Sequence, residues 1–182
     1  MKKRAIRIVS GVAVLVAFLS SPLFGNEAVL SLAGKTAPLF RAVGSDGNPV
    51  VLERLLDKKG PVLLNFWGLR CGSCIQEIPH LNDLFRRYEG AGLTILGVNV
   101  DGLPGAKIRE QVERMGIEML YPWIADPDFK LIELYHMSGA PLNVIIGSSG
   151  EVRYYHEGFE EGDEAALERE IKRAMPVAHE AK

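Results

Sequence analysis

Apolar residues gather in three short, uncharged runs at 62–67, 93–100 and 142–146. Runs of this kind, bounded by glycine, proline or polar residues, are typical of strands that are covered on both faces of a sheet. Between the first two runs, residues 72–88 place apolar side chains at three- and four-residue steps, which predicts an amphipathic helix. A strand, a helix and a strand of these lengths favour a right-handed crossover, so we expect the first two strands to pair in parallel.

Weaker patterns on either side of this unit predict smaller elements. Residues 36–43 and 50–52 flank a cluster of turn-forming residues at 44–49 and predict a β-hairpin. Strands that alternate with helices indicate an α/β fold. The other expected elements are a helical turn at 53–59, a helix at 106–115, a short strand at 121–125, a short helix at 127–135, a strand at 151–156 that forms a hairpin with 142–146, and a last helix at 164–175.

The two cysteines of the chain, Cys71 and Cys74, follow the strand expected at 62–67 and lie at the start of the helix expected at 72–88. A C-x-x-C pair at a strand-to-helix junction indicates a dithiol redox site. Unpaired backbone N–H groups and the positive end of the helix dipole stabilise a thiolate on the first cysteine, and Arg70 adds positive charge beside it. We therefore expect Cys71 to be the nucleophile and Cys74 to be the shielded resolving thiol.

Two other uses of the cysteine pair are disfavoured. A zinc site needs four ligands, usually in two pairs, but the sequence has neither a second C-x-x-C nor an H-x-x-x-H pair. Its histidines are His80, His136, His156 and His179. A structural disulfide across so short a loop removes little conformational entropy from the unfolded chain. The pattern therefore favours redox chemistry.

Composition narrows the function classes only slightly. A chain of 182 residues with 47% apolar and 24% charged residues suits one globular domain with an appendage. A net charge of -2 leaves no basic footprint of the kind that nucleic-acid-binding proteins carry. We therefore expect no nucleic-acid partner.

The N-terminal stretch has the pattern of an export signal. A basic start is followed by an uncharged apolar segment, which is typical of a signal peptide. Residues 8–24 are also close to the length of a membrane span, so an uncleaved anchor is the alternative. In either case the domain is exported to a compartment in which disulfides persist, and keeping a dithiol reduced there needs a dedicated supply of electrons. The expected division is a signal peptide or membrane anchor at 1–25, a linker at 26–35, one folded domain at 36–176 and a tail at 177–182.

Several motifs occur together along the chain: Asn65-Phe66-Trp67-Gly68, Cys71-x-x-Cys74, Glu77-x-Pro79, Val98-Asn99-Val100-Asp101, Tyr121-Pro122, Asp126-Pro127, and Gly139-Ala140-Pro141 before a strand and Gly150. In this combination and spacing the chain resembles the thioredoxin superfamily, and more closely the exported thiol–disulfide oxidoreductases of the TlpA/ResA type. The similarity runs from about Ala37 to Met175. The resemblance implies an α/β thioredoxin fold: a central mixed β-sheet flanked by helices, with an N-terminal β-hairpin extension and a helical insertion after the second core strand.

The resemblance also implies roles for residues around the dithiol. Pro141 is expected to be cis and to pack beside the cysteines, where the backbone of Ala140 is presented to an extended client segment. Glu77 matches a glutamate three residues after the second cysteine of ResA-like proteins, and this spacing allows it to share a helix face with Cys74. Burial would raise the pKa of this carboxyl and let it relay a proton to or from Cys74. We therefore count Glu77 as catalytic, together with Cys71 and Cys74.

Three neighbouring positions are expected to matter for clients or for proton handling. Trp67 is expected to pack beneath the site as a wall and, with Arg70, to contribute to client binding. Asn65 stands where thioredoxins carry a buried aspartate. Since an amide does not titrate, proton handling shifts to Glu77 or to water.

The chain departs from the family's pattern in three places. Arg70 stands where the family mostly has tryptophan or a similar residue, so contacts with partners are expected to differ. Gly72-Ser73 lacks the proline that often fills the second spacer position, and Leu142-Asn143 replaces a Thr-Thr-type pair after the expected cis proline. The reduction potential and the client therefore do not follow from the resemblance.

These features predict an extracytoplasmic thiol–disulfide oxidoreductase, in the periplasm or on the outer face of the cytoplasmic membrane. The resemblance implies that it reduces client disulfides, of the cytochrome c maturation or copper-site assembly type, with electrons from a DsbD/CcdA-type membrane reductant. No metal is expected, and no cofactor other than the Cys71–Cys74 disulfide. The alternatives are a disulfide-introducing oxidase or isomerase, and a copper chaperone that uses both cysteines and a histidine, for which His136 is the candidate. A peroxidase is disfavoured because the Pro-x-x-x-Thr-x-x-Cys signature is absent.

Overall fold

A computed structural model of the chain describes residues 31–58 and 60–176. The first apolar run becomes β3 (Val62–Trp67), which lies in the middle of a sheet and is buried along its whole length. It pairs in parallel with β4 (Thr94–Asn99) and antiparallel with β6 (Leu142–Ile146). The predicted parallel pairing of the first two strands is therefore confirmed.

Two outer strands complete the sheet. β5 (Trp123–Ala125) lies parallel to β4, and β7 (Val152–Glu157) lies antiparallel to β6. Within the described residues the result is a five-stranded mixed sheet in the order β5-β4-β3-β6-β7. The helices that the sequence places between these strands cover its faces.

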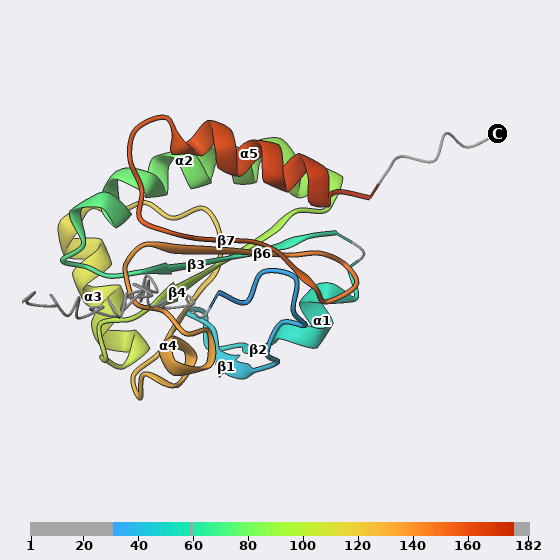
Figure 1. Ribbon diagram of the computed structural model, residues 1–182. Coiled ribbons are helices and arrows are strands. Elements are labelled where there is room, and N and C mark those ends of the chain that lie inside the picture. Colours follow the sequence, from blue (N-terminus) through green and yellow to red (C-terminus); the bar gives the residue numbers. More distant parts are fainter. Residues whose placement is uncertain (1–30, 59, 177–182) are drawn as a thin grey trace, which may run out of the picture.

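The two faces of the sheet are covered by different elements because successive residues of a strand point to opposite faces. On one face Leu63 belongs to an apolar cluster with α2 (Gly72–Tyr88) and α5 (Asp163–Ala174). On the other face Leu64 belongs to a second cluster, which includes α4 (Lys130–Leu134). Figure 1 shows α2 and α5 together on one side of the sheet and α4 on the other.

The predicted N-terminal hairpin is present but shorter than expected. β1 (Arg41–Val43) and β2 (Pro49–Val51) pair antiparallel, and α1 (Leu52–Leu56) follows directly. Only residues 41–43 of the expected first strand join this ladder, because β2 ends at Val51, the partner of Arg41, and α1 begins at the next residue. Gly44, in the turn between the strands, bridges to β5 and so attaches the hairpin to the edge of the sheet.

The helical insertion after β4 is also present. α3 (Gly105–Met115) lies between β4 and β5 in sequence, and its buried residues Ile108 and Val112 join a third apolar cluster, which contains Trp67. A short 3-10 helix, η1 (Glu89–Ala91), leads from α2 to β4. The mixed sheet, its flanking helices, the hairpin and the insertion together confirm the predicted architecture.

Part of the expected linker packs onto the domain instead. Leu32 is only 5% exposed and belongs to the same cluster as Leu64. The Gly34 N–H donates to the carbonyl oxygen of Val152 at 2.8 Å, and the Val152 N–H donates to that of Lys35 at 2.9 Å. The linker prediction is therefore wrong for these residues, since their backbone pairs with the start of β7.

The two terminal segments of the predicted division are the remaining ones to compare with the structure. The signal peptide or anchor expected at 1–25 and the tail expected at 177–182 lie outside the described residues. None of the helices in the described part of the chain is both long and apolar enough to cross a membrane.

Candidate active site

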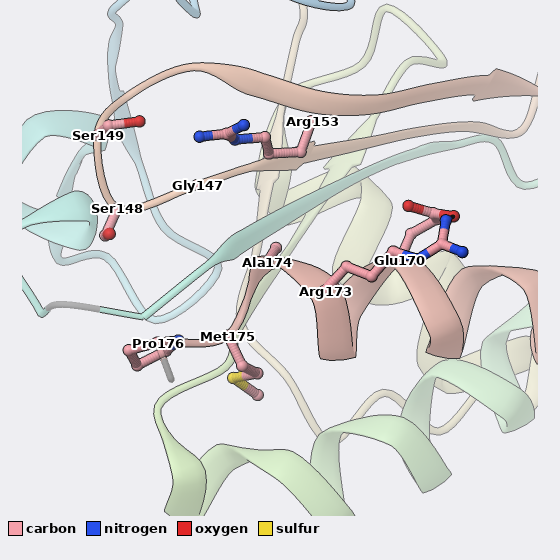
Figure 2. A pocket seen from close by; sticks show the side chains of 9 residues that line it. All are labelled: Gly147, Ser148, Ser149, Arg153, Glu170, Arg173, Ala174, Met175 and Pro176. Atoms are coloured by element: carbon pink, nitrogen blue, oxygen red, sulfur yellow. Dashed lines mark hydrogen bonds and ion pairs between the residues drawn. The ribbon is translucent and has the colours of Figure 1, made fainter. Parts of the chain in front are cut away.

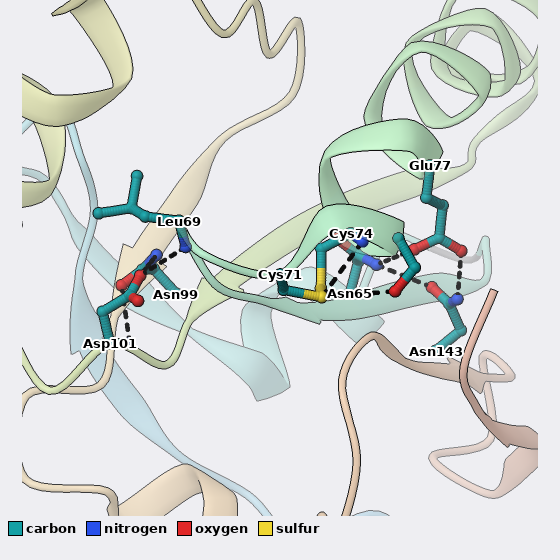
Figure 3. Close-up of a disulfide and its surroundings, with 9 residues drawn as sticks. Asn65, Leu69, Cys71, Cys74, Glu77, Asn99, Asp101 and Asn143 are labelled. Carbon is teal, nitrogen blue, oxygen red and sulfur yellow. Dashed lines mark hydrogen bonds between the residues drawn. A yellow bond between two sulfur atoms is a disulfide. The ribbon is translucent and has the colours of Figure 1, made fainter. Parts of the chain in front are cut away.

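Cys71 and Cys74 form a disulfide, with an S–S distance of 2.00 Å, where the chain passes from β3 into α2 (Figure 3). Cys71 is the N-cap residue of α2 and is half-buried, whereas Cys74 is 1% exposed. The Cys71 Sγ accepts a hydrogen bond from the Cys74 backbone N–H at 3.2 Å and lies 3.6 Å from the Ser73 Oγ. These groups and the helix N-terminus stabilise negative charge on Cys71 when the disulfide opens. Cys71 is the sulfur that another molecule reaches more easily.

The turn before Cys71 is held by a carboxylate at the end of β4. Asp101 Oδ2 accepts hydrogen bonds from the Leu69 backbone N–H at 2.8 Å and from the Asn99 Nδ2 at 2.7 Å. The Asp101 N–H donates in turn to the Asn99 Oδ1 at 3.1 Å. Because β3 and β4 are parallel, their carboxyl ends meet at this edge of the sheet. The contacts fix the backbone that leads to Cys71.

Pro141 follows a cis peptide bond, as predicted. The antiparallel register of β3 and β6 pairs Leu142 with Phe66, so Pro141 lies at the end of β3 from which the chain continues to Cys71. Pro141 is buried, whereas Ala140 is exposed. Ala140 is therefore accessible at the edge of the site.

The loop that leads into Pro141 is clamped from β7. The Glu157 carboxylate accepts hydrogen bonds from the Ser138 N–H at 2.6 Å and from the Ser138 hydroxyl at 2.5 Å. The Gly158 N–H donates to the carbonyl oxygen of Pro141 at 2.7 Å. The last residue of β7 and the residue after it thus hold this loop in place.

Glu77 lies on α2, one turn beyond Cys74, and is 1% exposed. Its Oε2 accepts a hydrogen bond from the Asn65 Nδ2 at 2.9 Å, and its Oε1 accepts one from the Asn143 Nδ2 at 2.5 Å (Figure 3). Burial raises the pKa of Glu77 from 4.5 to about 7, although the two amide donors act in the opposite direction. The carboxyl therefore titrates near neutral pH.

Trp67 supports the site from within the core. Its side chain is 0% exposed, belongs to the same apolar cluster as Cys74 and Ile78, and meets Trp123 edge to face with ring centroids 6.4 Å apart. The predicted wall beneath the dithiol fits this position. The expectation that Trp67 also contacts clients does not, because it has no exposed surface to offer.

Arg70 is exposed and directly precedes Cys71. The salt bridges found among residues 31–58 and 60–176 do not include Arg70. Its guanidinium group is thus available on the surface beside the more accessible sulfur.

Three residues of this site did not emerge as functional from the sequence. They are Asp101, Asn143 and Glu157. For Asn143 a signal did exist, since an amide inside an otherwise apolar buried strand needs a hydrogen-bond partner. For Asp101 and Glu157 the local pattern gives no hint of which backbone N–H they will meet.

A separate surface pocket lies at the other end of the sheet (Figure 2). It has a volume of about 470 Å³ and lies between the turn after β6 and the end of α5, with Arg153, Glu170 and Arg173 among its lining residues. β6 begins beside Pro141 and runs toward this turn, so the pocket does not belong to the dithiol site.

The chain is similar to families of known redox proteins. Residues 33–155 match the AhpC/TSA family. The thiol-disulfide oxidoreductase ResA of Geobacillus kaustophilus is 32% identical over 160 residues, which cover 84% of this chain and 88% of the relative.

Solved structures of thiol–disulfide proteins have a similar fold. A candidate thiol:disulfide interchange protein DsbE from Chlorobium tepidum superposes with a TM-score of 0.72 at 28% identity, covering 79% of this chain and 98% of that one. The exposed lipoprotein thioredoxin of Streptococcus pneumoniae strain TIGR4 superposes with a TM-score of 0.63 at 25% identity, covering 75% of this chain and 99% of that one. The fold is therefore that of thioredoxin-like proteins.

Proposed function

We propose that this chain, which belongs to the AhpC/TSA family and is a thiol–disulfide oxidoreductase of the ResA type, reduces disulfides of client proteins outside the cytoplasm. The observation that carries the proposal is the unequal placement of the two sulfurs. Cys71 is half-buried at the N-terminus of α2, and Cys74 is buried inside the first turn. This arrangement offers one sulfur to a client and protects the other until a mixed disulfide has formed.

The reaction uses the two sulfurs in turn. In the reduced protein the Cys71 thiolate attacks one sulfur of the client disulfide, forms a mixed disulfide and displaces the other client sulfur as a thiolate. Cys74 then loses its proton, attacks the Cys71 Sγ and displaces the second client sulfur. The client gains two electrons, and the protein is left with the Cys71–Cys74 disulfide.

Glu77 is the group to which we assign the proton of Cys74. Cys74 is buried, so its thiol needs a nearby acceptor before it attacks. Within the described part of α2, Glu77 is the buried carboxyl, and it lies one turn from Cys74. A carboxyl whose pKa burial raises to about 7 exchanges a proton efficiently near neutral pH.

The proposed direction needs electrons from outside the domain. The export pattern at 1–25 supports a location beyond the cytoplasmic membrane, and the Streptococcus pneumoniae relative is itself described as an exposed lipoprotein. In such a compartment we propose a DsbD/CcdA-type membrane thiol transporter as the donor. The proposed clients carry cysteine pairs that must be reduced before haem attachment or copper insertion.

The midpoint potential of the Cys71–Cys74 pair tests the direction. It is measured in glutathione and dithiothreitol buffers through tryptophan fluorescence, because Trp67 packs in the same cluster as Cys74. A value near that of thioredoxin, about −270 mV, supports a reductant. A value of about −120 mV overturns the proposal and indicates a disulfide donor. The Cys71→Ser variant is the control, since it cannot form the pair and should show no redox-dependent fluorescence change.

A further inference from the structure

We propose that Asn143 is a positioning residue of the dithiol site: with Asn65, it holds the Glu77 carboxyl in a closed ring of hydrogen bonds and so controls how readily that carboxyl takes up a proton. The inference rests on the proposed function, in which Glu77 handles the proton of Cys74. Asn143 is not assigned any contact with a sulfur atom. It acts on the reaction only through Glu77.

The ring joins three elements that are far apart in sequence. Asn65 on β3 and Asn143 on β6 are directly opposite each other in the antiparallel register, so both side chains lie on the same face of the sheet. The Asn65 Nδ2 donates to the Asn143 Oδ1 at 3.0 Å and to the Glu77 Oε2 at 2.9 Å. The Asn143 Nδ2 closes the ring by donating to the Glu77 Oε1 at 2.5 Å. Figure 3 shows the three side chains converging beside α2.

The ring matches one protonation state of Glu77. Both carboxylate oxygens accept a hydrogen bond from an amide N–H, and an ionised carboxylate offers acceptors only. A protonated carboxyl would need an acceptor for its O–H, which the two Nδ2 groups do not provide. The buried Asn65 Oδ1, which has no hydrogen-bond partner within the described residues, would supply one only if the Asn65 amide turned over. The ring therefore opposes protonation, while burial favours it.

Other titratable groups surround this ring and act on it less directly. Asp163 at the start of α5 raises the pKa of Glu77 by charge repulsion, after the larger effect of burial. Tyr121, ahead of β5, is buried, and its pKa is raised far above neutral by burial, so its hydroxyl stays uncharged. His80 follows Glu77 on α2, and His156 lies opposite Asn143 on β7. Asn65 and Asn143 are the residues that contact the carboxylate with hydrogen bonds.

The inference depends on residue 143 being an asparagine. A threonine hydroxyl would have to donate and accept through one oxygen on a shorter side chain, whereas the asparagine amide donates to Glu77 from its Nδ2 and accepts from Asn65 at its Oδ1, two separate atoms. Asn143 therefore ties the glutamate and the strand amide into one unit.

The Asn143→Ala variant of the full-length chain tests the inference. We measure the pH dependence of the Cys71–Cys74 midpoint potential and of the rate of model disulfide reduction between about pH 5 and pH 9. Loss of a hydrogen bond to a charged group should move the inflection due to Glu77 upward by about one pH unit. Asn143→Thr, which keeps one donor, should fall between wild type and Asn143→Ala.

Two controls separate positioning from general damage. Asn82→Ala removes another buried asparagine, whose side chain contacts the backbone of Glu118 and Leu120 instead of the ring, and it should leave the inflection unchanged. Glu77→Gln should abolish the inflection, and adding Asn143→Ala to it should then change nothing further.

The outcomes distinguish this inference from the proposed function. If Asn143→Ala and Asn143→Thr both keep the wild-type inflection while Glu77→Gln removes it, the positioning role is wrong and the proton role of Glu77 stands. The positioning role is also wrong if adding Asn143→Ala to Glu77→Gln changes the pH profile as much as Asn143→Ala changes the profile of wild type. If Glu77→Gln itself leaves the profile unchanged, the proton role of Glu77 is overturned, and the positioning inference with it.

Discussion

The backbone N–H of Cys74 donates a hydrogen bond to the Sγ of Cys71 at 3.2 Å, so the main chain of the buried cysteine supports the accessible sulfur. The same turn of α2 thus protects one sulfur and stabilises charge on the other. The charge on the Cys71 sulfur is stabilised because the first backbone N–H groups of a helix have no partner within the helix. This arrangement leads to a first prediction about the two cysteines.

Replacing the cysteines one at a time should have opposite consequences. Cys71→Ser should abolish disulfide exchange because the accessible nucleophile is lost. Cys74→Ser should still attack a client but should accumulate the mixed disulfide, since no second thiol releases it. Non-reducing electrophoresis with mass spectrometry of the adducts measures both results. Adducts on Cys74 in the Cys71→Ser variant would contradict the assignment.

Glu77 should make the folded state less stable as the pH rises toward neutrality. Burial raises its pKa from 4.5 to about 7, so between these values the folded state binds a proton that the unfolded state has released. Relative to Glu77→Gln, wild type should therefore lose about 3 kcal/mol of unfolding free energy across this window and then level off. Urea unfolding of the oxidised proteins at several pH values measures the difference. A difference that is constant with pH would show that Glu77 titrates normally.

An Asn65→Asp substitution should turn the ring into a carboxylate pair. The Asn65 Nδ2 is 2.9 Å from the Glu77 Oε2, so the new carboxylate would lie against the old one and the two would share a proton. We expect two separate apparent pKa values for the pair, one of them well above that of Glu77 in wild type. Carboxyl-carbon NMR titration measures them, and Asn65→Ser, which adds no charge, is the control. A single unshifted transition in Asn65→Asp would be inconsistent with the ring.

Glu157→Ala should loosen the loop that leads to Pro141. The lost carboxylate contacts both the N–H and the hydroxyl of Ser138, so the backbone before Pro141 loses its clamp. If this loop receives the client, KM for a protein disulfide should rise several-fold with a smaller change in kcat, a loss of about 1 kcal/mol of binding. Glu160→Ala, at an exposed position of the next loop, is the control. An unchanged KM would separate the loop from client binding.

Gly97→Ala should overpack the apolar cluster beneath the dithiol. A Cβ at this position of β4 would lie 3.0 Å from the Met119 Cε and 3.1 Å from the Trp67 Nε1. It would also lie 3.0 Å from the Trp123 Cβ, which is fixed to the neighbouring strand β5, and the Trp67 indole is fully buried. We therefore expect a loss of about 1–3 kcal/mol in unfolding free energy. Gly90→Ala is the matched control, because a Cβ there meets no neighbouring atom within 4 Å. Equal stability of the two variants in denaturant would contradict the packing argument.

The sequence by itself determined the elements whose signals are local. The apolar run at 62–67 and the three- and four-residue periodicity of 72–88 predict β3 and α2 with the bounds that the structure has. The position of the cysteine pair between them also follows, because the apolar run, the helical periodicity and the junction that separates them all lie within residues 62–88. The resemblance then supplied the cis bond before Pro141 and the interest in Glu77.

Only the tertiary structure decided which polar groups meet. Asn65 and Asn143 are 78 residues apart, and Asp101 reaches the backbone of Leu69 across 32 residues. These pairings depend on which strands become neighbours and in which register, so no local pattern specifies them. The same reason explains why Trp67 proved fully buried and why the backbone around Gly34 pairs with β7. A sequence pattern shows that a buried amide needs a partner, but only the assembled sheet supplies it.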